Sequence, residues 1–110
     1  MVLVVEGNNE IEEQAAIENW WTEEERAGYL ELFEGIIPEI IKAECPEISF
    51  VTSSPSSHGG FVEPSSENVG DTHYWQVWHG NLPFTEYRRH FFRFLSEFGF
   101  QSFPSMKTIE

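Results

Sequence analysis

Two kinds of apolar pattern alternate along this chain of 110 residues, and their order constrains the fold more than any other feature of the sequence. Amphipathic stretches at residues 11–42 and 84–92 predict helices. Short β-branched or aromatic runs predict strands at residues 2–6, 48–52, 72–79 and 93–96. Such an alternation is typical of parallel βαβ units, so we expect an α/β fold with helices outside a parallel sheet.

The longer amphipathic stretch, residues 11–42, contains two expected interruptions. Thr22 followed by Glu25 has the spacing of a capping box, so a helix boundary is expected there. Gly35 and Pro38 weaken the later part, because proline lacks a backbone donor and its ring crowds the preceding turn. We therefore expect a kink or a restart of the helix near Pro38.

A long segment without apolar periodicity, residues 53–70, separates the second and third expected strands. It is dense in Ser, Pro and Gly, which predicts a loop. Loops of this length in compact domains are usually functional or disordered. A mobile surface linker and a loop with a direct role both stay open at this point.

The charge balance excludes several kinds of partner. The net charge is −13, and nucleic-acid affinity is built largely from Lys and Arg contacts, so no nucleic-acid partner is expected. No apolar run reaches the length of a membrane span, and the first residues lack the features of a signal peptide, so we expect a soluble protein without membrane contact. Cys45 stands alone, which excludes an intrachain disulfide and leaves the compartment open.

Two glutamates are placed at the ends of expected strands. Glu10 follows the first strand across the turn Gly7-Asn8-Asn9, and Glu97 follows the fourth strand, 87 residues later. The carboxyl ends of parallel strands converge at one face of an α/β fold. Paired carboxylates there suit glycoside hydrolysis, in which one carboxyl protonates the departing oxygen and the other attacks or activates water at the anomeric carbon. The competing interpretation is chance, because glutamate is the commonest charged residue here.

Three motifs along the chain give these glutamates a context: GNNE at residues 7–10, GDTHYWQVWHG at residues 70–80 and SEFGFQSFPS at residues 96–105. Together they resemble the catalytic barrel of the β-mannosidases, glycoside hydrolases related to the β-galactosidases and β-glucuronidases. The resemblance covers nearly the whole chain. It implies a partial TIM (β/α)8 barrel, with about strands 4 to 7 supplied by these 110 residues and the helices outside.

The resemblance also implies roles for individual residues. Asn9-Glu10 matches the Asn-Glu pair of the family, so Asn9 would bind the sugar hydroxyl next to the anomeric centre and Glu10 would be the general acid/base. Glu97 would be the nucleophile of a retaining double displacement, with the two carboxyl groups about 5–5.5 Å apart. An ionised Glu97 would help to keep a proton on Glu10. The expected reaction releases terminal β-D-mannose from β-mannosides, with no cofactor and no metal ion.

The aromatic run of residues 72–79 supplies the other substrate-binding candidates. The Tyr74 hydroxyl would orient Glu97, and Trp75 or Trp78 would form an apolar platform for a sugar ring. The competing interpretation is that these residues are core residues of a half-buried strand. Strand alternation places Tyr74 and Trp78 on one face of the strand, and it places three residues on the opposite face: His73, Trp75 and His79.

The chain departs from the family pattern in two ways. Val5 stands where the family usually has a tryptophan, two residues before the glycine of GNNE. The first three barrel strands, the eighth strand and the accessory β domains have no counterpart, so residues 1–110 are expected to be one incomplete piece of a catalytic barrel domain. Open sheet edges then predict self-association. The compartment would be cytoplasmic for a bacterial protein and lysosomal for an animal one.

Two other interpretations stay open. Asp71, His73 and His79 share one expected strand face and carry oxygen and nitrogen ligands, but residues six apart on a strand are separated by roughly 20 Å, too far to share a metal ion unless the strand bends. The second alternative is a non-enzyme, an inactive or carbohydrate-binding fragment that kept the motifs and lost turnover. The preferred sugar rests on family resemblance alone.

Overall fold

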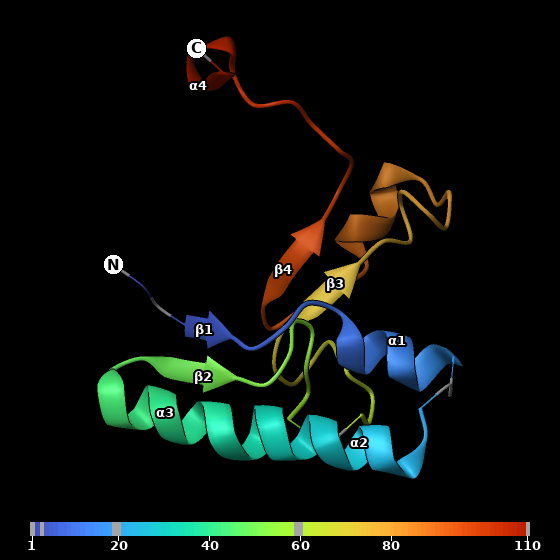
Figure 1. The fold of residues 1–110 in the computed structure, drawn as a ribbon. Coiled ribbons are helices and arrows are strands. Elements are labelled where there is room, and N and C mark those ends of the chain that lie inside the picture. Colours follow the sequence, from blue (N-terminus) through green and yellow to red (C-terminus); the bar gives the residue numbers. More distant parts are fainter. Residues whose placement is uncertain (1, 3, 19–20, 59–60, 110) are drawn as a thin grey trace.

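The computed structural model describes residues 2, 4–18, 21–58 and 61–109, in which short parallel strands alternate with helices (Figure 1). This confirms the expected α/β class. The first half contains β1 (Val4–Glu6), α1 (Ile11–Glu18), α2 (Glu23–Leu30), the π-helix η1 (Glu31–Ile36), α3 (Ile37–Glu44) and β2 (Ser49–Val51). The second half contains β3 (Thr72–Tyr74), the 3-10 helix η2 (Phe84–Arg88), β4 (Leu95–Phe98) and α4 (Met106–Ile109).

The four strands form two parallel pairs. β1 pairs with β2, with Val5 opposite Phe50, and β3 pairs with β4, with His73 opposite Glu97. The parallel direction matches the expectation. Within the part of the chain that the structure describes, however, the strands form two separate two-stranded sheets rather than one continuous sheet of four strands.

The turn after β1 is held by backbone contacts. An isolated parallel bridge joins it to the residues that follow β2: the Ser54 amide donates to the Asn8 carbonyl at 2.9 Å, and the Glu10 amide donates to the Ser54 carbonyl at 2.7 Å. A Cβ atom on Gly7 would lie 2.5 Å from the carbonyl oxygen of Thr52, so the close approach of the two segments requires glycine at this position.

The helices α2, η1 and α3 lie end to end as one rod (Figure 1). The expected capping box is confirmed: the Thr22 amide donates to Glu25 Oε2 at 2.8 Å, and the Glu25 amide donates to Thr22 Oγ1 at 3.2 Å. The expected kink or restart takes the form of a change of helix type. The Ile37 amide donates to the Leu32 carbonyl, five residues back, and Pro38 then falls in the first turn of α3, where a missing amide donor costs little.

Three predicted elements of the second half differ from those observed. The expected strand of residues 72–79 ends at Tyr74, because the chain turns: the His79 amide donates to the Trp75 carbonyl at 2.7 Å. The expected helix of residues 84–92 is the shorter η2. The expected strand of residues 93–96 begins at Leu95 and includes Glu97, and α4 follows where no closing element was expected.

The interior of the described molecule is more polar than apolar. Tyr29, Tyr74 and Val77 are its buried hydrophobic residues. A larger set of buried residues is polar or charged: Glu12, Ser53, Ser54, Ser56, Asp71, Thr72 and His73. The buried serines begin the segment of residues 53–70, so the start of that segment is an internal element and not a surface linker.

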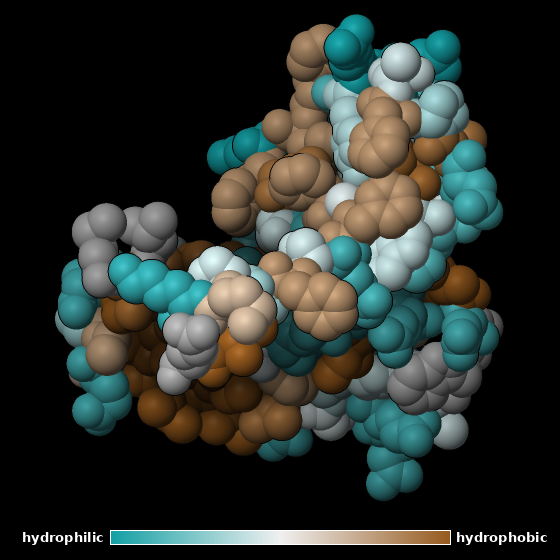
Figure 2. All heavy atoms as spheres, turned by 90° about the horizontal axis from the view of Figure 1, so that it is seen from above, coloured by the Kyte–Doolittle hydropathy of each residue, from teal (hydrophilic) through white to brown (hydrophobic). Residues whose placement is uncertain are grey.

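Large apolar side chains are exposed over much of the surface. Figure 2 shows brown, apolar atoms on both the upper and the lower part of the face that is seen from above. Phe91 is 86% exposed and Phe103 is 97% exposed. Among the described helices, none has the length and apolar character needed to cross a membrane.

Candidate active site

Glu10 and Glu97 both lie beside the buried imidazole of His73. Glu10 ends the turn after β1 and immediately precedes α1. Its φ of 59° is in the left-handed region, which is uncommon for a residue with a side chain and is often found at functional sites. Glu97 lies on β4 directly beside His73 of β3. Nδ1 of His73 lies 2.9 Å from Oε1 of Glu10 and 3.8 Å from Oε2 of Glu97.

The two carboxyl groups therefore share one site. One carboxylate oxygen of Glu10, one ring nitrogen of His73 and one carboxylate oxygen of Glu97 all lie within 4.8 Å of one another. These two carboxylate oxygens are therefore at most 4.8 Å apart. The His73 side chain is fully enclosed, whereas the side chains of Glu10 and Glu97 are 25% and 41% exposed. A molecule that approaches from solvent can reach both carboxylates but not the imidazole behind them.

The hydrogen bonds on Glu10 stabilise its ionised form. Burial raises the pKa of Glu10, but hydrogen bonds from His73, Trp75 and Gln14, together with the charge of His73, outweigh burial and hold the pKa below its ordinary value. This direction is opposite to the expectation that a neighbouring Glu97 keeps a proton on Glu10. The reason is that these partners act directly on the Glu10 carboxylate.

A buried polar network supports His73 from behind. The Oγ atom of Ser54 lies 2.6 Å from Oδ2 of Asp71 and 2.9 Å from Nε2 of His73. Ser96 donates to the same Asp71 oxygen at 2.7 Å, and the Ser56 amide donates to Oδ1 of Asp71 at 3.0 Å. Buried charged groups are stable only when they are hydrogen-bonded, and this network meets that requirement for Asp71.

The two asparagines of GNNE have different environments. The Asn8 side chain donates to the Tyr29 hydroxyl and to the Thr52 carbonyl, both at 3.0 Å, and accepts from the Ser53 hydroxyl at 2.8 Å. Asn8 therefore joins the turn after β1 to α2 and to the end of β2. The Asn9 side chain is exposed next to Glu10, where it is accessible to a ligand.

Tyr74 is not placed as expected. Its hydroxyl lies 2.9 Å from Nε2 of His90, and Nδ1 of the same histidine lies 2.6 Å from Oε1 of Glu67. Burial, followed by the nearby charges of Glu86 and Glu67, raises the pKa of Tyr74. The expectation that the Tyr74 hydroxyl orients Glu97 is corrected: Tyr74 is on the face of β3 opposite His73, and it packs in the second half of the molecule.

Trp75 and Trp78 flank the site in a way that strand alternation did not predict. The indole Nε1 of Trp75 donates to Oε1 of Glu10 at 3.3 Å. Because the chain turns after Trp75, the rings of Trp75 and Trp78 lie 5.8 Å apart, and Trp78 stacks on His79 at 4.6 Å. The alternation held for His73 and Trp75, which both contact Glu10, and failed after Trp75.

Among the described residues, the side chains that could hold a metal ion are Glu10, His73 and Glu97. The set considered from the sequence was Asp71, His73 and His79, and it is not brought together because His79 packs on Trp78. Nδ1 of His73 already makes a hydrogen bond to Glu10 at 2.9 Å. The arrangement is that of a hydrogen-bonded pair, and we assign no metal ligands to it.

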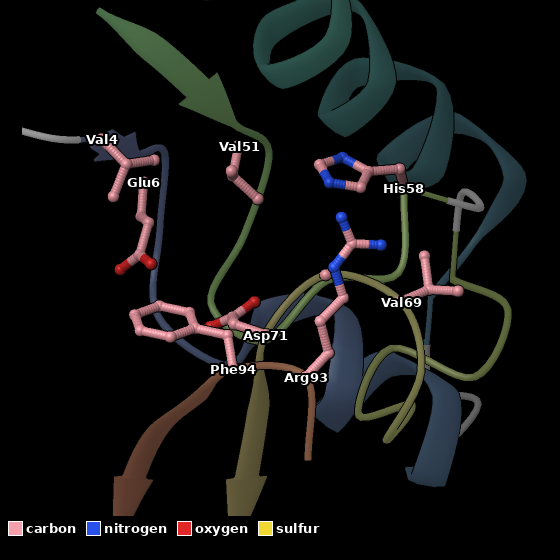
Figure 3. Close-up of a pocket in the computed structure, with 9 residues that line it drawn as sticks. Val4, Glu6, Val51, His58, Val69, Asp71, Arg93 and Phe94 are labelled. Atoms are coloured by element: carbon pink, nitrogen blue, oxygen red, sulfur yellow. The ribbon is translucent and has the colours of Figure 1, made fainter.

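A cavity of about 310 Å³ is lined by Asp71 of the buried polar network and by other residues, but by neither Glu10 nor Glu97 (Figure 3). Figure 3 shows the Arg93 side chain extending toward His58. Burial, followed by the charge of Asp71, raises the pKa of Glu6 in its wall. The lining residues come from β1, β2 and the segments before β3 and β4: Val4, Glu6, Val51, His58, Val69, Gly70, Asp71, Arg93 and Phe94.

Sequence reasoning missed the two residues at the centre of the site. His73 was considered only as a possible metal ligand, and Ser54 was one serine of an expected loop. The signal for His73 was its position two residues from Trp75 on one strand face. No local signal marks Ser54, because its partners Asp71 and His73 are 17 and 19 residues away.

The chain is similar to known proteins over nearly its whole length. β-Mannosidase B of Aspergillus terreus is 34% identical to the chain over 126 residues, and β-mannosidase B of Aspergillus niger is 33% identical over 126 residues; both matches include 99% of the chain. The crystal structure of the β-D-mannosidase of Dictyoglomus thermophilum matches 97% of the chain, with a TM-score of 0.73 and 33% identity. The chain is β-mannosidase-like over nearly its whole length. No protein-family model matches it.

The resemblance drawn from the three motifs is thus confirmed. The β-mannosidase-like chain spans only a small part of these relatives, 14% of each Aspergillus protein and 13% of the Dictyoglomus chain. Glu10, His73 and Glu97, which are far apart in the sequence, lie together in this short span.

Proposed function

We propose that this chain carries the two catalytic carboxylates of a retaining β-mannosidase, as about strands 4 to 7 of a (β/α)8 barrel. The observation that supports this most is the separation of at most 4.8 Å between oxygens of Glu10 and Glu97. Retaining glycosidases hold their carboxyl groups about 5–5.5 Å apart, whereas inverting enzymes need about 6.5–9.5 Å to admit a water molecule. The substrate class, a terminal β-D-mannoside, comes from the names of the relatives.

The proposed reaction has two steps. In the first, the Glu97 carboxylate attacks the anomeric carbon while Glu10 gives its proton to the departing oxygen, and a glycosyl ester forms on Glu97. In the second, Glu10 takes a proton from water, the water oxygen attacks the anomeric carbon, and the ester bond to Glu97 breaks. The exposed Asn9 would bind the hydroxyl next to the anomeric centre, and Trp75 or Trp78 would contact the sugar ring.

The low pKa of Glu10 has a consequence for this scheme. Glu10 must be protonated before the first step, and its hydrogen bonds favour the ionised form. The fraction of chains that carry this proton falls as the pH rises, so the first step is expected to slow as the pH rises through the pKa of Glu10.

A second candidate is a carbohydrate-binding or inactive fragment with no turnover of its own. Two observations favour it. The chain spans 14% of its Aspergillus relative, so most of that protein has no counterpart in these 110 residues. The hydrogen bonds on Glu10 also lower its pKa, which favours the ionised form that cannot donate a proton.

The test is release of a phenol from aryl β-mannosides by the chain and by Glu10→Ala and Glu97→Ala, with Glu31→Ala on the exposed surface of η1 as the matched control. Both site variants are expected to lose at least about 100-fold in activity and the control none. With a dinitrophenyl leaving group, which departs without a proton, Glu10→Ala is expected to lose much less in the first step.

Added azide separates the two roles. It can replace the nucleophile in Glu97→Ala and give an inverted mannosyl azide, and it can replace the attacking water in Glu10→Ala and give a retained one. Absence of turnover by the unaltered chain, with mannoside binding intact, would instead support the inactive, carbohydrate-binding fragment.

A further inference from the structure

The contacts around His73 define where its protons lie. Ser54 has one hydroxyl proton, and its Oγ atom is 2.6 Å from the Asp71 carboxylate and 2.9 Å from Nε2 of His73. A carboxylate accepts hydrogen bonds and does not donate them, so the Ser54 proton is directed to Asp71. Glu6, the other ionisable group close to Ser54, is also an acceptor when ionised. The Ser54 oxygen is then left to accept, and Nε2 of His73 must donate to it.

The opposite nitrogen of the same ring faces Glu10. Nδ1 of His73 lies 2.9 Å from Oε1 of Glu10, and this distance requires a proton between the two atoms, because two facing lone pairs would repel. If Nε2 already carries a proton, the proton between Nδ1 and Glu10 is a second one. It belongs to the Glu10–His73 pair, and it resides on Nδ1 whenever Glu10 is ionised.

We infer that Asp71 and Ser54 fix the orientation of His73 so that its Nδ1 atom holds and returns the proton of Glu10. His73 is enclosed and does not face the substrate side, so it acts as a positioning residue and not as a catalytic one. The use of this proton in mannoside cleavage rests on the proposed function. The direction of the hydrogen bonds does not.

The surroundings of the ring agree with this role. Four acidic side chains act directly on His73: Glu6 from β1, Glu10 just before α1, Glu13 in α1 and Glu97 from β4. Asp71 acts on the ring through Ser54. Aromatic contact comes from Trp75, whose ring centroid lies 6.3 Å from that of His73. The only direct contacts of the ring nitrogens among the described residues are with Ser54, Glu10 and Glu97.

The experiment is nitrogen NMR of the chain labelled with ¹⁵N-histidine, with the His73 signals assigned by their loss in His73→Gln. The nitrogen shifts report which ring nitrogen carries a proton. The inference expects Nε2 to be protonated at every pH at which the chain is folded. A neutral ring with its proton on Nδ1 alone would overturn it, because Ser54 would then be the donor to Nε2.

Two variants make the assignment to Ser54 specific. Ser54→Ala removes the acceptor of Nε2, so the protection of the Nε2 proton from solvent exchange is expected to fall and the Glu10 carboxyl is expected to titrate at higher pH. Ser96→Ala removes a bond to the same Asp71 oxygen without touching His73, and both readouts are expected to stay unchanged. Equal effects of the two variants, or no effect of Ser54→Ala, would overturn the inference.

Failure of the proposed function gives a different result. A chain with no mannoside turnover and a protonated Nε2 on His73 would contradict the catalytic scheme and leave the hydrogen-bond assignment intact. If Ser54→Ala does not fold, the measurement on the unaltered chain decides the matter alone.

Discussion

The exposure of aromatic side chains differs between the two halves of the molecule. In the first half Tyr29 is buried, and its ring lies 4.8 Å from Phe33 and 4.9 Å from Phe61. In the second half Phe91 and Phe103 are 86% and 97% exposed, and every phenylalanine among the exposed large apolar residues of the described chain lies between residues 84 and 103. The second half also buries one tyrosine, Tyr74, whose ring lies 5.0 Å from Phe92, but it has in addition phenylalanine side chains that the described residues do not cover.

The two paired glutamates come from different halves of the molecule. Glu10 is contributed by the first half and Glu97 by the second, and the groups between them, Ser54, Asp71 and His73, are buried and polar. The site therefore depends on hydrogen bonds between distant segments more than on apolar packing. Substitutions of the exposed aromatic residues and of the buried polar residues should therefore have different effects.

The largest effect is expected from the exposed aromatic surface. We expect the chain to self-associate, and we expect Phe91→Ser with Phe103→Ser to weaken association roughly 1,000-fold, because burial of each ring contributes about 2 kcal/mol. Analytical ultracentrifugation over a range of concentrations measures this change. The control is Ile17→Ser with Ile40→Ser, two exposed residues of the first half that are 76% and 54% exposed.

A smaller change in the control pair than in the phenylalanine pair is the expected outcome. Equal changes would show that the two surfaces do not differ. An unaltered chain that is a monodisperse monomer with one cooperative melting transition would contradict the difference between the halves altogether.

The next largest effect is expected in the polar centre. Asp71→Asn places an amide where three donors converge, from Ser54, Ser96 and the Ser56 backbone, so at least one buried donor loses its acceptor. The free energy of unfolding should fall by about 3 kcal/mol, measured by urea denaturation of the less associating phenylalanine variant. Glu31→Gln, on the exposed helix surface, should change it by less than about 0.5 kcal/mol. A fall of similar size in both variants would contradict the role of the network.

A smaller and pH-dependent effect is expected at Glu12, which is 1% exposed and accepts a hydrogen bond from the Tyr29 hydroxyl at 3.0 Å. Burial raises the pKa of Glu12. A group with a raised pKa in the folded state stabilises the fold below its ordinary pKa, and this contribution is lost as the pH rises through the raised value.

Glu12→Gln removes this dependence and keeps a hydrogen-bonding side chain of the same length. The free energy of unfolding of the variant should match that of the unaltered chain near pH 4 and exceed it at neutral pH, measured by urea denaturation at both values. A difference that does not vary with pH would show that Glu12 does not titrate as its burial requires.

Local patterns in the sequence were sufficient to predict several elements of the first half. The capping box at Thr22 and Glu25, the strands β1 and β2 and the turn at Gly7 depend on neighbouring residues and on short-range rules, and the structure contains all of them. The three motifs also identified the relatives. The carboxylates were expected near one another because parallel strands place their carboxyl ends at one edge.

Local patterns failed where long-range contacts decide the structure. High β-propensity extended the expected third strand to His79, but the strand ends at Tyr74, the chain turns after Trp75, and Trp78 stacks on His79. The serines at the start of the segment of residues 53–70 are typical of a loop, yet Ser54 is buried because Asp71 and His73 bind it. The pKa of Glu10 likewise depends on His73, 63 residues away, which the spacing of the two glutamates did not reveal.

The most direct test of the account asks whether Glu10 and Glu97 face each other, and it needs no turnover. Carbon NMR follows the titration of the Glu10 carboxyl in the unaltered chain, in Glu97→Gln and in the control Glu86→Gln. Two charges 4.8 Å apart interact by about 1 kcal/mol even in water, so removal of the Glu97 charge should lower the pH at which Glu10 titrates by at least about half a pH unit, while the control leaves it unchanged. A Glu10 titration that is the same in Glu97→Gln as in the unaltered chain would contradict the shared site.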